Sequence, residues 1–175
     1  MLFRSTPLAL ALVAPFGTPL VEAMLNPKID INAPTPFNTE AWAKQPASPF
    51  LIAVTYNSHR TVRALIARGA DPKLPGPWGF PVGHFAAYYG HIETLEALRE
   101  SGVDLLKPIA GGRPHAGQTY LMHAVHGGRD NVIDYLVKLG ADPAQKDANG
   151  RTAADHAIEY KRIVMAAKLK AGWTQ

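Results

Sequence analysis

A tripeptide of glycine, a small apolar residue and aspartate occurs three times in this chain and sets a period for most of the sequence. Its copies begin at Gly69, Gly102 and Gly140, so they are separated by 33 and 38 residues. A short run centred on alanine precedes each copy, and a further run of this kind begins at Thr152. Two signatures that repeat in phase predict a stack of small similar units instead of one globular core.

Each unit reads as two short helices. A Ser, Thr or Pro opens the first helix, and Asn57, Gly90 or Gly128 ends it, because Gly and Asn tolerate a positive φ at low cost. Apolar residues at helical spacing, such as Ile92 and Leu95, then indicate a second helix. The glycine of the tripeptide ends that helix, and a turn-rich stretch follows. Because one helix pair cannot bury its apolar face alone, neighbouring units must stack.

This pattern resembles the ankyrin repeat, whose hallmark is Thr-Pro-Leu-His-x-Ala at a period near 33 residues. Ser48-Pro49 keeps the opening, His84 keeps the histidine, and Thr119 and Thr152 keep the threonine, although no unit keeps all four. The resemblance spans at least residues 46–175 and implies an all-α solenoid of stacked helix-loop-helix units with short β-turn fingers. We expect one domain over residues 1–175, with repeats at about 6–45, 46–80, 81–118, 119–151 and 152–175.

Residues 1–23 fit two interpretations. Arg4, the apolar run 7–16 and Val21-Glu22-Ala23 look like a secretory signal that is cleaved after Ala23. The segment also matches a first repeat, because Thr6-Pro7-Leu8-Ala9-Leu10-Ala11 lacks only the histidine of the hallmark. We expect a first repeat and a cytoplasmic protein, and the alternative of a secreted or periplasmic protein stays open.

Composition and charge narrow the classes of function. The chain has no cysteine, which excludes disulfides, thiol catalysis and cysteine-ligated zinc. No apolar run reaches the length of a membrane span, so we expect no membrane partner. Basic residues such as Lys161 and Arg162 are expected on the outer faces of second helices, apart from the aromatic residues. A surface that binds nucleic acid interleaves basic and aromatic residues, so we expect no nucleic-acid partner either.

Histidines are the main feature of the sequence that suggests chemistry. His123 and His126 lie three residues apart, and His156 follows His123 by 33, so a pair from adjacent units could bind zinc. No third ligand has a suitable spacing, and hydrogen bonding within a stack also explains histidines at these positions. Motifs for a catalytic triad or a phosphate loop lack their sequence context. We expect no enzyme, cofactor or metal, with a histidine-based metal-dependent protein as the alternative.

Tyrosines give the clearest indication of a binding surface. In ankyrin proteins the last two residues before the break of each first helix face the concave groove. In this chain these residues include Tyr56, Tyr88, Tyr89, His126 and Tyr160. Tyr is typical of binding hot spots because it offers rigid apolar area and a hydroxyl. Core packing is the alternative, but each helix already has an apolar face for that purpose. We therefore predict that these five residues contact a partner.

The finger loops are predicted to extend this surface. Their candidate residues are Trp78, Phe80, Arg113, His115, Lys146, Asn149 and Arg151. Trp78 could instead cover the core of its own unit. The function that we expect is non-enzymatic binding of a folded protein by a monomeric chain. A small inhibitor or immunity-type binder is the more specific form of that hypothesis, and the sequence does not identify the partner.

Overall fold

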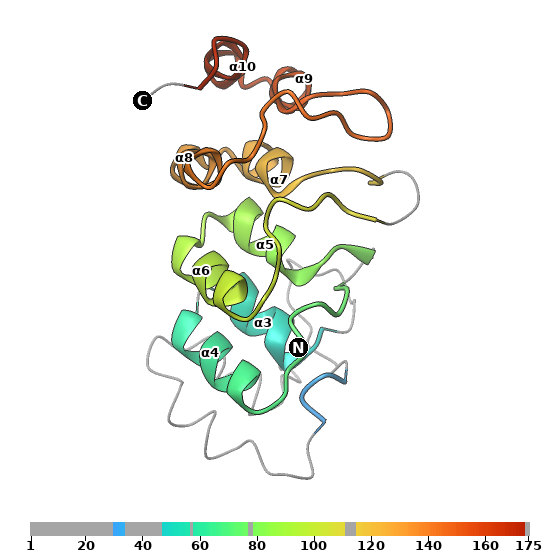
Figure 1. Ribbon diagram of the computed structural model, residues 1–175, viewed down its shortest axis with the longest axis vertical. Coiled ribbons are helices and arrows are strands. Elements are labelled where there is room, and N and C mark those ends of the chain that lie inside the picture. The colour runs from blue at the N-terminus through green and yellow to red at the C-terminus, as the bar shows by residue number, and fades with distance from the viewer. Residues whose placement is uncertain (1–29, 34–46, 57, 77–78, 111–114, 174–175) are drawn as a thin grey trace, which may run out of the picture. The chain divides into compact units, whose positions relative to one another are not determined.

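The computed structural model in Figure 1 describes residues 30–33, 47–56, 58–76, 79–110 and 115–173. Within these ranges the regular structure is helical and no strand occurs, which confirms the expected all-α class. In chain order the helices are α3 (Pro49–Thr55), α4 (His59–Ala67), α5 (Val82–Tyr89), α6 (Ile92–Glu100), α7 (Tyr120–Gly127), α8 (Asp130–Lys138), α9 (Ala153–Glu159) and α10 (Ile163–Lys170).

Side-chain caps fix the start of three of the first helices. The hydroxyl oxygens of Ser48 and Thr119 each accept a hydrogen bond of 3.2 Å from the backbone N–H three residues later, before α3 and α7. Before α9, Thr152 and Asp155 form a capping box, in which each side chain accepts from the backbone N–H of the other residue. The Ser and Thr residues of the repeated signature therefore mark helix starts, as predicted.

The glycine of the repeated tripeptide ends the second helix of each pair. Gly69, Gly102 and Gly140 have φ angles of 93°, 88° and 100°, a left-handed conformation that suits residues without a Cβ. The backbone N–H after each glycine donates to the carbonyl five residues earlier, at 2.9 to 3.1 Å. This is the Schellman pattern, which satisfies carbonyls at the helix end.

The aspartate of the tripeptide shapes the turn that follows. The carboxylates of Asp71, Asp104 and Asp142 each accept the backbone N–H two residues later, at 2.8 to 2.9 Å. Asp30 makes the same contact with the N–H of Asn32 at 2.9 Å. The side-chain oxygen of Asn32 accepts in turn from the N–H of Asp71, also at 2.9 Å. The same local interaction thus follows each copy of the tripeptide and occurs once more at Asp30.

The chain divides into two compact units, and the first comprises residues 1–82 and 96–103. In its described part α3 packs against α4. Arg63 and Glu100 form an exposed ion pair within this unit. The buried apolar residues of the unit include Phe50, Leu51, Ile52, Val54, Val62, Leu65 and Leu98.

The second unit comprises residues 83–95 and 104–175 and contains the candidate site. Within it α7 packs against both α8 and α9, and α9 packs against α10, so two helix pairs stack (Figure 1). Small residues at the contacts allow the first helices to approach closely. The buried apolar residues of this unit include Ala86, Ala87, Leu121, Ala124, Val125, Val132, Ile133, Leu136, Ala153 and Ala157.

Loops between the helix pairs form the expected β-turn fingers. Ile109 exchanges backbone hydrogen bonds of 2.9 Å with Gln118 and Gly117, which pairs the two arms of one finger. The N–H of Ala148 in the next finger donates to the carbonyl of Ala116 at 2.9 Å, which joins the two fingers. These backbone bonds hold the loops of the second unit at the edge of the candidate site.

Several predictions concern residues outside the described ranges. They include the interpretation of residues 1–23 and the finger residues Trp78 and Arg113. The division into one domain and five repeats likewise stays a prediction. In the part of the chain that the structure describes, no helix combines the length and the apolar character needed to cross a membrane.

Candidate functional site

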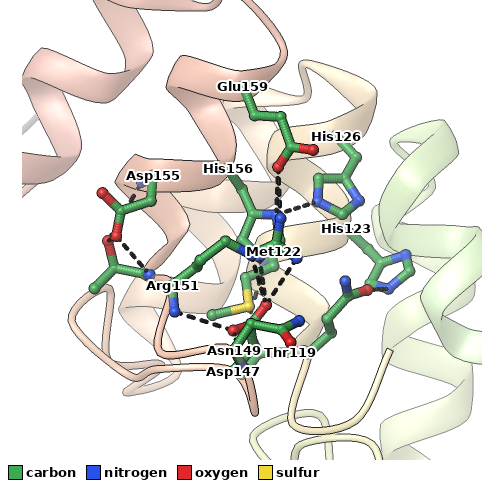
Figure 2. A network of polar contacts seen from close by, with 12 residues as sticks. Thr119, Met122, His123, His126, Asp147, Asn149, Arg151, Asp155, His156 and Glu159 are labelled. Atoms are coloured by element: carbon green, nitrogen blue, oxygen red, sulfur yellow. Dashed lines mark hydrogen bonds and ion pairs between the residues drawn. The ribbon is translucent and has the colours of Figure 1, made fainter. Parts of the chain in front are cut away.

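Asp147 anchors a buried polar network in the second unit (Figure 2). Its side chain is 0% exposed, and Oδ1 accepts the backbone N–H groups of Asn149 and Arg151 at 2.8 and 3.0 Å. These bonds close the tight turn that the sequence of the finger predicts. Oδ2 accepts from the Arg151 guanidinium at 3.1 Å and from His156 Nε2 at 3.0 Å. The carboxylate therefore joins the finger to α9.

His156 continues the network to His126 on α7. The Nδ1 atom of His156 lies 2.9 Å from Nε2 of His126 (Figure 2). Because His156 Nε2 faces the Asp147 carboxylate, that nitrogen carries the hydrogen, and Nδ1 of the neutral ring accepts. His126 Nε2 must then donate. The hydrogen-bond pattern thus assigns one tautomer to each neutral ring and links the finger, α9 and α7.

A row of rings extends from His126 toward α5. The centroids of His126 and His123 are 5.2 Å apart, and those of His123 and His84 are 4.8 Å apart. His84 in turn stacks on Tyr120 at 3.9 Å, and both histidines of this part of the row are buried. The ring of His123 also hydrogen bonds the Gln118 side chain at 3.1 Å. Four histidines from three first helices thus form one buried group.

Burial changes the protonation of this group. It lowers the pKa of His126 to about 3, with the neighbouring His156 ring acting in the same direction. Burial also lowers the pKa of His123 well below its usual value, and lowers that of His156 against the opposing effect of Asp147. Burial alone would raise the pKa of Asp147, but the hydrogen bonds from the finger hold it at about 2. At neutral pH the carboxylate is therefore charged, and the rings of His123, His126 and His156 are neutral.

Two tyrosines lie on the surface above this network. Tyr88 lies in the last turn of α5 and is 39% exposed, and Tyr160 follows α9 and is 47% exposed. The Tyr160 ring stacks on His126 with 4.5 Å between centroids and 20° between planes. Partial burial and then the charge of Glu159 raise the pKa of Tyr160, and Tyr88 acts in the same direction. A buried, hydrogen-bonded imidazole therefore supports an exposed phenol ring.

The other residues of the predicted tyrosine surface differ in burial. Tyr89 is half-buried and contacts the Tyr88 ring at 5.1 Å. His126 is only 9% exposed, so it supports its neighbours instead of presenting area of its own. Tyr56 is 41% exposed at the end of α3, in the first unit. The second unit thus brings four of the five predicted residues together, and a stripe that includes Tyr56 stays a prediction.

Among the described finger residues, some side chains are exposed and others form contacts within the chain. Lys146 and Asn149 are exposed on the finger that holds Asp147. Arg151 is engaged within the chain, because its guanidinium also bonds the Glu159 carboxylate at 2.7 Å. Two further candidates, Phe80 and His115, are half-buried.

Two arginines connect the first helices of successive pairs, a role that the sequence did not predict. Arg129 Nε donates to the carbonyl of Tyr88 at 3.1 Å, and Arg162 Nη2 donates to that of His126 at 2.9 Å. The expected place of Arg162 on the outer face of a second helix is corrected, because α10 begins at Ile163 and Arg162 reaches back to α7. Arg129 and Arg162 are 33 residues apart, and this repeat spacing is the signal in the sequence that could have identified their common role.

The arrangement of these groups is that of a structural network. Hydrogen bonds within the chain engage both ring nitrogens of His156 and the Nε2 atoms of His123 and His126. Among the residues that the structure describes, no group of three or more His, Cys, Asp or Glu is placed to hold a metal ion. The network fixes the finger, α7 and α9 to one another, and the chemistry at the surface is that of exposed phenol, lysine and amide groups.

Comparison with known proteins places the repeat pattern in a family. Residues 84–171 match the family described as ankyrin repeats, in three copies. A probable E3 ubiquitin-protein ligase, XBOS33, of Oryza sativa subsp. japonica is 33% identical over 87 residues, which are 49% of this chain and 16% of that protein. Ankyrin repeat and SOCS box protein 2 of Bos taurus is 28% identical over 98 residues, 56% of this chain and 15% of that protein. The chain thus spans about one sixth of the length of these relatives.

Proposed function

The chain belongs to the ankyrin-repeat family, whose repeats are protein–protein interaction modules, and from this premise we propose that it binds a folded protein without catalysing a reaction. Ankyrin repeats are generally non-enzymatic, although one relative is named a probable ligase. The observation that favours a particular surface is the exposure of Tyr88 and Tyr160 above the buried histidine network. We assign the central contacts of the partner to these two tyrosines.

The two tyrosine side chains are already held in place before a partner binds. An exposed side chain that is mobile in the free protein loses conformational entropy when a partner immobilises it. The Tyr160 ring is already stacked on His126, whose position is fixed by its hydrogen bond to His156. Tyr88 is in edge contact with Tyr89. Both rings therefore offer apolar area and a hydroxyl at a low additional entropic cost, as binding hot spots do.

Polar contacts at the edge of this surface would come from the fingers. Lys146 and Asn149 are exposed on the finger whose base is Asp147, and the network holds that finger to α9. Exposed polar groups around buried aromatic anchors exclude water and add specificity more than affinity. We propose that Tyr56, Trp78 and Arg113, which were predicted from the sequence, also contact the partner.

A narrower form of the proposal is that the chain acts as a small inhibitor or immunity-type binder. We propose that it does so as a monomer in the cytoplasm, and the exported form with cleavage after Ala23 is the alternative. The activity of a captured partner tests the first part, because an inhibitor lowers that activity when it binds. The intact mass of the protein from native cells tests the second part, because cleavage leaves a chain that starts at Met24.

An affinity capture experiment with two variants tests the proposed surface. Wild-type protein, Tyr88→Ala/Tyr160→Ala and the control Ile163→Ala/Val164→Ala are immobilised and exposed to native lysate. The control removes apolar residues that are 63% and 74% exposed at the start of α10. We expect the wild type and the control to retain the same protein and the tyrosine variant to lose it at least about tenfold, because hot-spot residues each contribute about 2 kcal/mol. Equal capture by all three proteins would contradict the tyrosine surface.

A further inference from the structure

Asp147, His156 and His126 form a continuous hydrogen-bonded chain across three parts of the second unit, with links of 3.0 and 2.9 Å. Asp147 belongs to the finger, His156 to α9 and His126 to α7. Each link joins segments that are separate in the sequence, and all three side chains are buried. We propose that this chain of residues is an acid-sensitive latch, which fastens the finger 142–151 and the pair α9–α10 onto α7 and releases them when the two imidazoles are protonated.

The protonation sequence of the two rings explains the release. When both are neutral, the N–H of His126 Nε2 donates to His156 Nδ1. A first proton can enter at His126 Nδ1, and the hydrogen between the rings then passes to His156 Nδ1. The hydrogen bond survives with reversed direction, and the charge lies on His156 beside the Asp147 carboxylate. A second proton leaves an N–H on both facing nitrogens, so the bond is lost and two cations lie side by side.

Charged and titratable groups from every neighbouring segment face the two rings. The carboxylates of Asp147 and Glu159 favour the first proton on His156, and Glu159 Oε2 lies 3.9 Å from its Nδ1. Cationic and imidazole groups oppose further protonation of His126 and of its neighbour His123. They come from α5, both fingers and the turn before α10, and they are His84, His115, Arg151 and Arg162. The two carboxylates therefore offset part of the effect of burial on the first proton, whereas a second proton meets the charge of the first as well as these groups.

The direction of the pH effect follows from these environments. A histidine whose folded-state pKa is lowered stabilises the fold fully above its unfolded pKa of about 6.5, and this contribution is lost as the pH falls toward the folded value. Between about pH 7.5 and about pH 5.5, each such histidine lowers the folding constant by up to about tenfold. His123, His126 and His156 together give up to about a thousandfold.

The last described helix pair is the part of the unit that such a loss would open first. Ile158 of α9 and Val125 of α7 occupy the same position of successive repeats. Ile158 is 44% exposed, whereas Val125 is fully buried. In repeat proteins each pair is stabilised by contacts with its immediate neighbours, and the main contact of this pair with another pair is that of α9 with α7. The latch belongs to that interface, because it joins α9 to α7.

The test uses the full chain and one substitution that keeps the hydrogen-bonding capacity of His156 without its titration. Glutamine offers an acceptor oxygen and a donor nitrogen but cannot take up a proton near neutral pH. His156→Gln, wild type and the control His59→Gln, at the start of α4, are unfolded with urea at about pH 7.5, 6.5 and 5.5 at constant ionic strength. We expect the folding constant of the wild type and the control to fall up to about a thousandfold, and that of His156→Gln about tenfold less.

Nuclear magnetic resonance on the wild type gives an independent readout if the glutamine variant does not fold. Near pH 6, where an ordinary histidine is largely protonated, we expect the imidazole nitrogens of His126 and His156 to show neutral rings in the assigned tautomers. On further acidification, the amide signals of residues 142–173 should broaden or shift before those of α7 and α8. Titration of both rings near pH 6.5 with unchanged amide signals would overturn the latch, and so would an equal pH dependence of His156→Gln and wild type.

Discussion

The ends of α7 and α9 occupy the same place in successive helix pairs. One end consists of glycines, and the other has two large side chains. Gly127 ends α7 and Gly128 follows it, whereas Tyr160 and Lys161 stand at the equivalent positions after α9. The backbone is similar in both, because Gly128 has a φ of 68° and Lys161 a φ of 58°. The backbone alone therefore does not explain why one turn has no side chains and the other has two long ones.

The neighbouring helix pair explains the difference. A Cβ at position 127 would overlap the carbonyl oxygen of Tyr88, and one at position 128 would overlap the Arg162 guanidinium. After α9, the Tyr160 ring finds room above His126, and the side chain of Lys161 is exposed. The comparison shows that the residues of a turn are determined by the pair that packs against it as much as by the helix that it ends.

The largest effect that this comparison predicts is at Gly127. In Gly127→Ala the new methyl group meets the backbone of α5, which cannot rotate away as a side chain can. We expect a loss of at least about 3 kcal/mol in the free energy of unfolding, measured by urea denaturation.

Gly150→Ala is the matched control for that substitution. Gly150 has a φ of 77°, and beyond its chain neighbours no heavy atom lies within 4 Å of the place that a Cβ would take. Alanine there meets only backbone strain, which costs about 1 kcal/mol. If the two variants lose similar stability, the close approach of Gly127 to α5 is not what excludes a side chain.

A smaller effect, of opposite sign, is expected at Lys161. A lysine in the left-handed conformation is strained, and glycine relieves that strain although it makes the unfolded chain more flexible. Lys161→Gly should raise the free energy of unfolding by about 0.5 to 1 kcal/mol. Lys146→Gly is the control, because Lys146 is also exposed and does not have a positive φ, so it should lose stability. A destabilised Lys161→Gly variant would show that the lysine side chain has a packing role.

The sequence predicted the features of the fold that depend on local chemistry. Thr119 and Thr152 begin helices because a hydroxyl caps the free N–H groups of the next turn. Gly69 and Gly140 end helices because the left-handed conformation favours glycine. Such signals recur every 33 to 38 residues, so the family and the all-α class followed from them.

The candidate site was predicted less completely because it depends on contacts between pairs. The histidine spacing was visible in the sequence, but nothing indicated that Asp147 would accept from His156 or that Arg162 would reach His126. His126 and Tyr88 share one position of the repeat, yet His126 is buried and Tyr88 is exposed, because His126 is covered by α9 and its turn. Burial at a repeat position is thus set by the next pair, which periodicity alone does not describe.

The distinction between a buried support and an exposed binding surface is the central claim, and thermal unfolding of two variants tests it most directly. His126→Ala leaves the buried Nδ1 of His156 without its donor and creates a cavity, which costs about 3 kcal/mol. Tyr88→Ala/Tyr160→Ala removes two exposed rings, and such surface changes cost about 0.5 kcal/mol each. With about 2 to 4 °C per kcal/mol, we expect the single variant to lose several degrees more in Tm than the double variant. An equal or larger loss in the tyrosine variant would show that these rings belong to the core, and the account would be wrong.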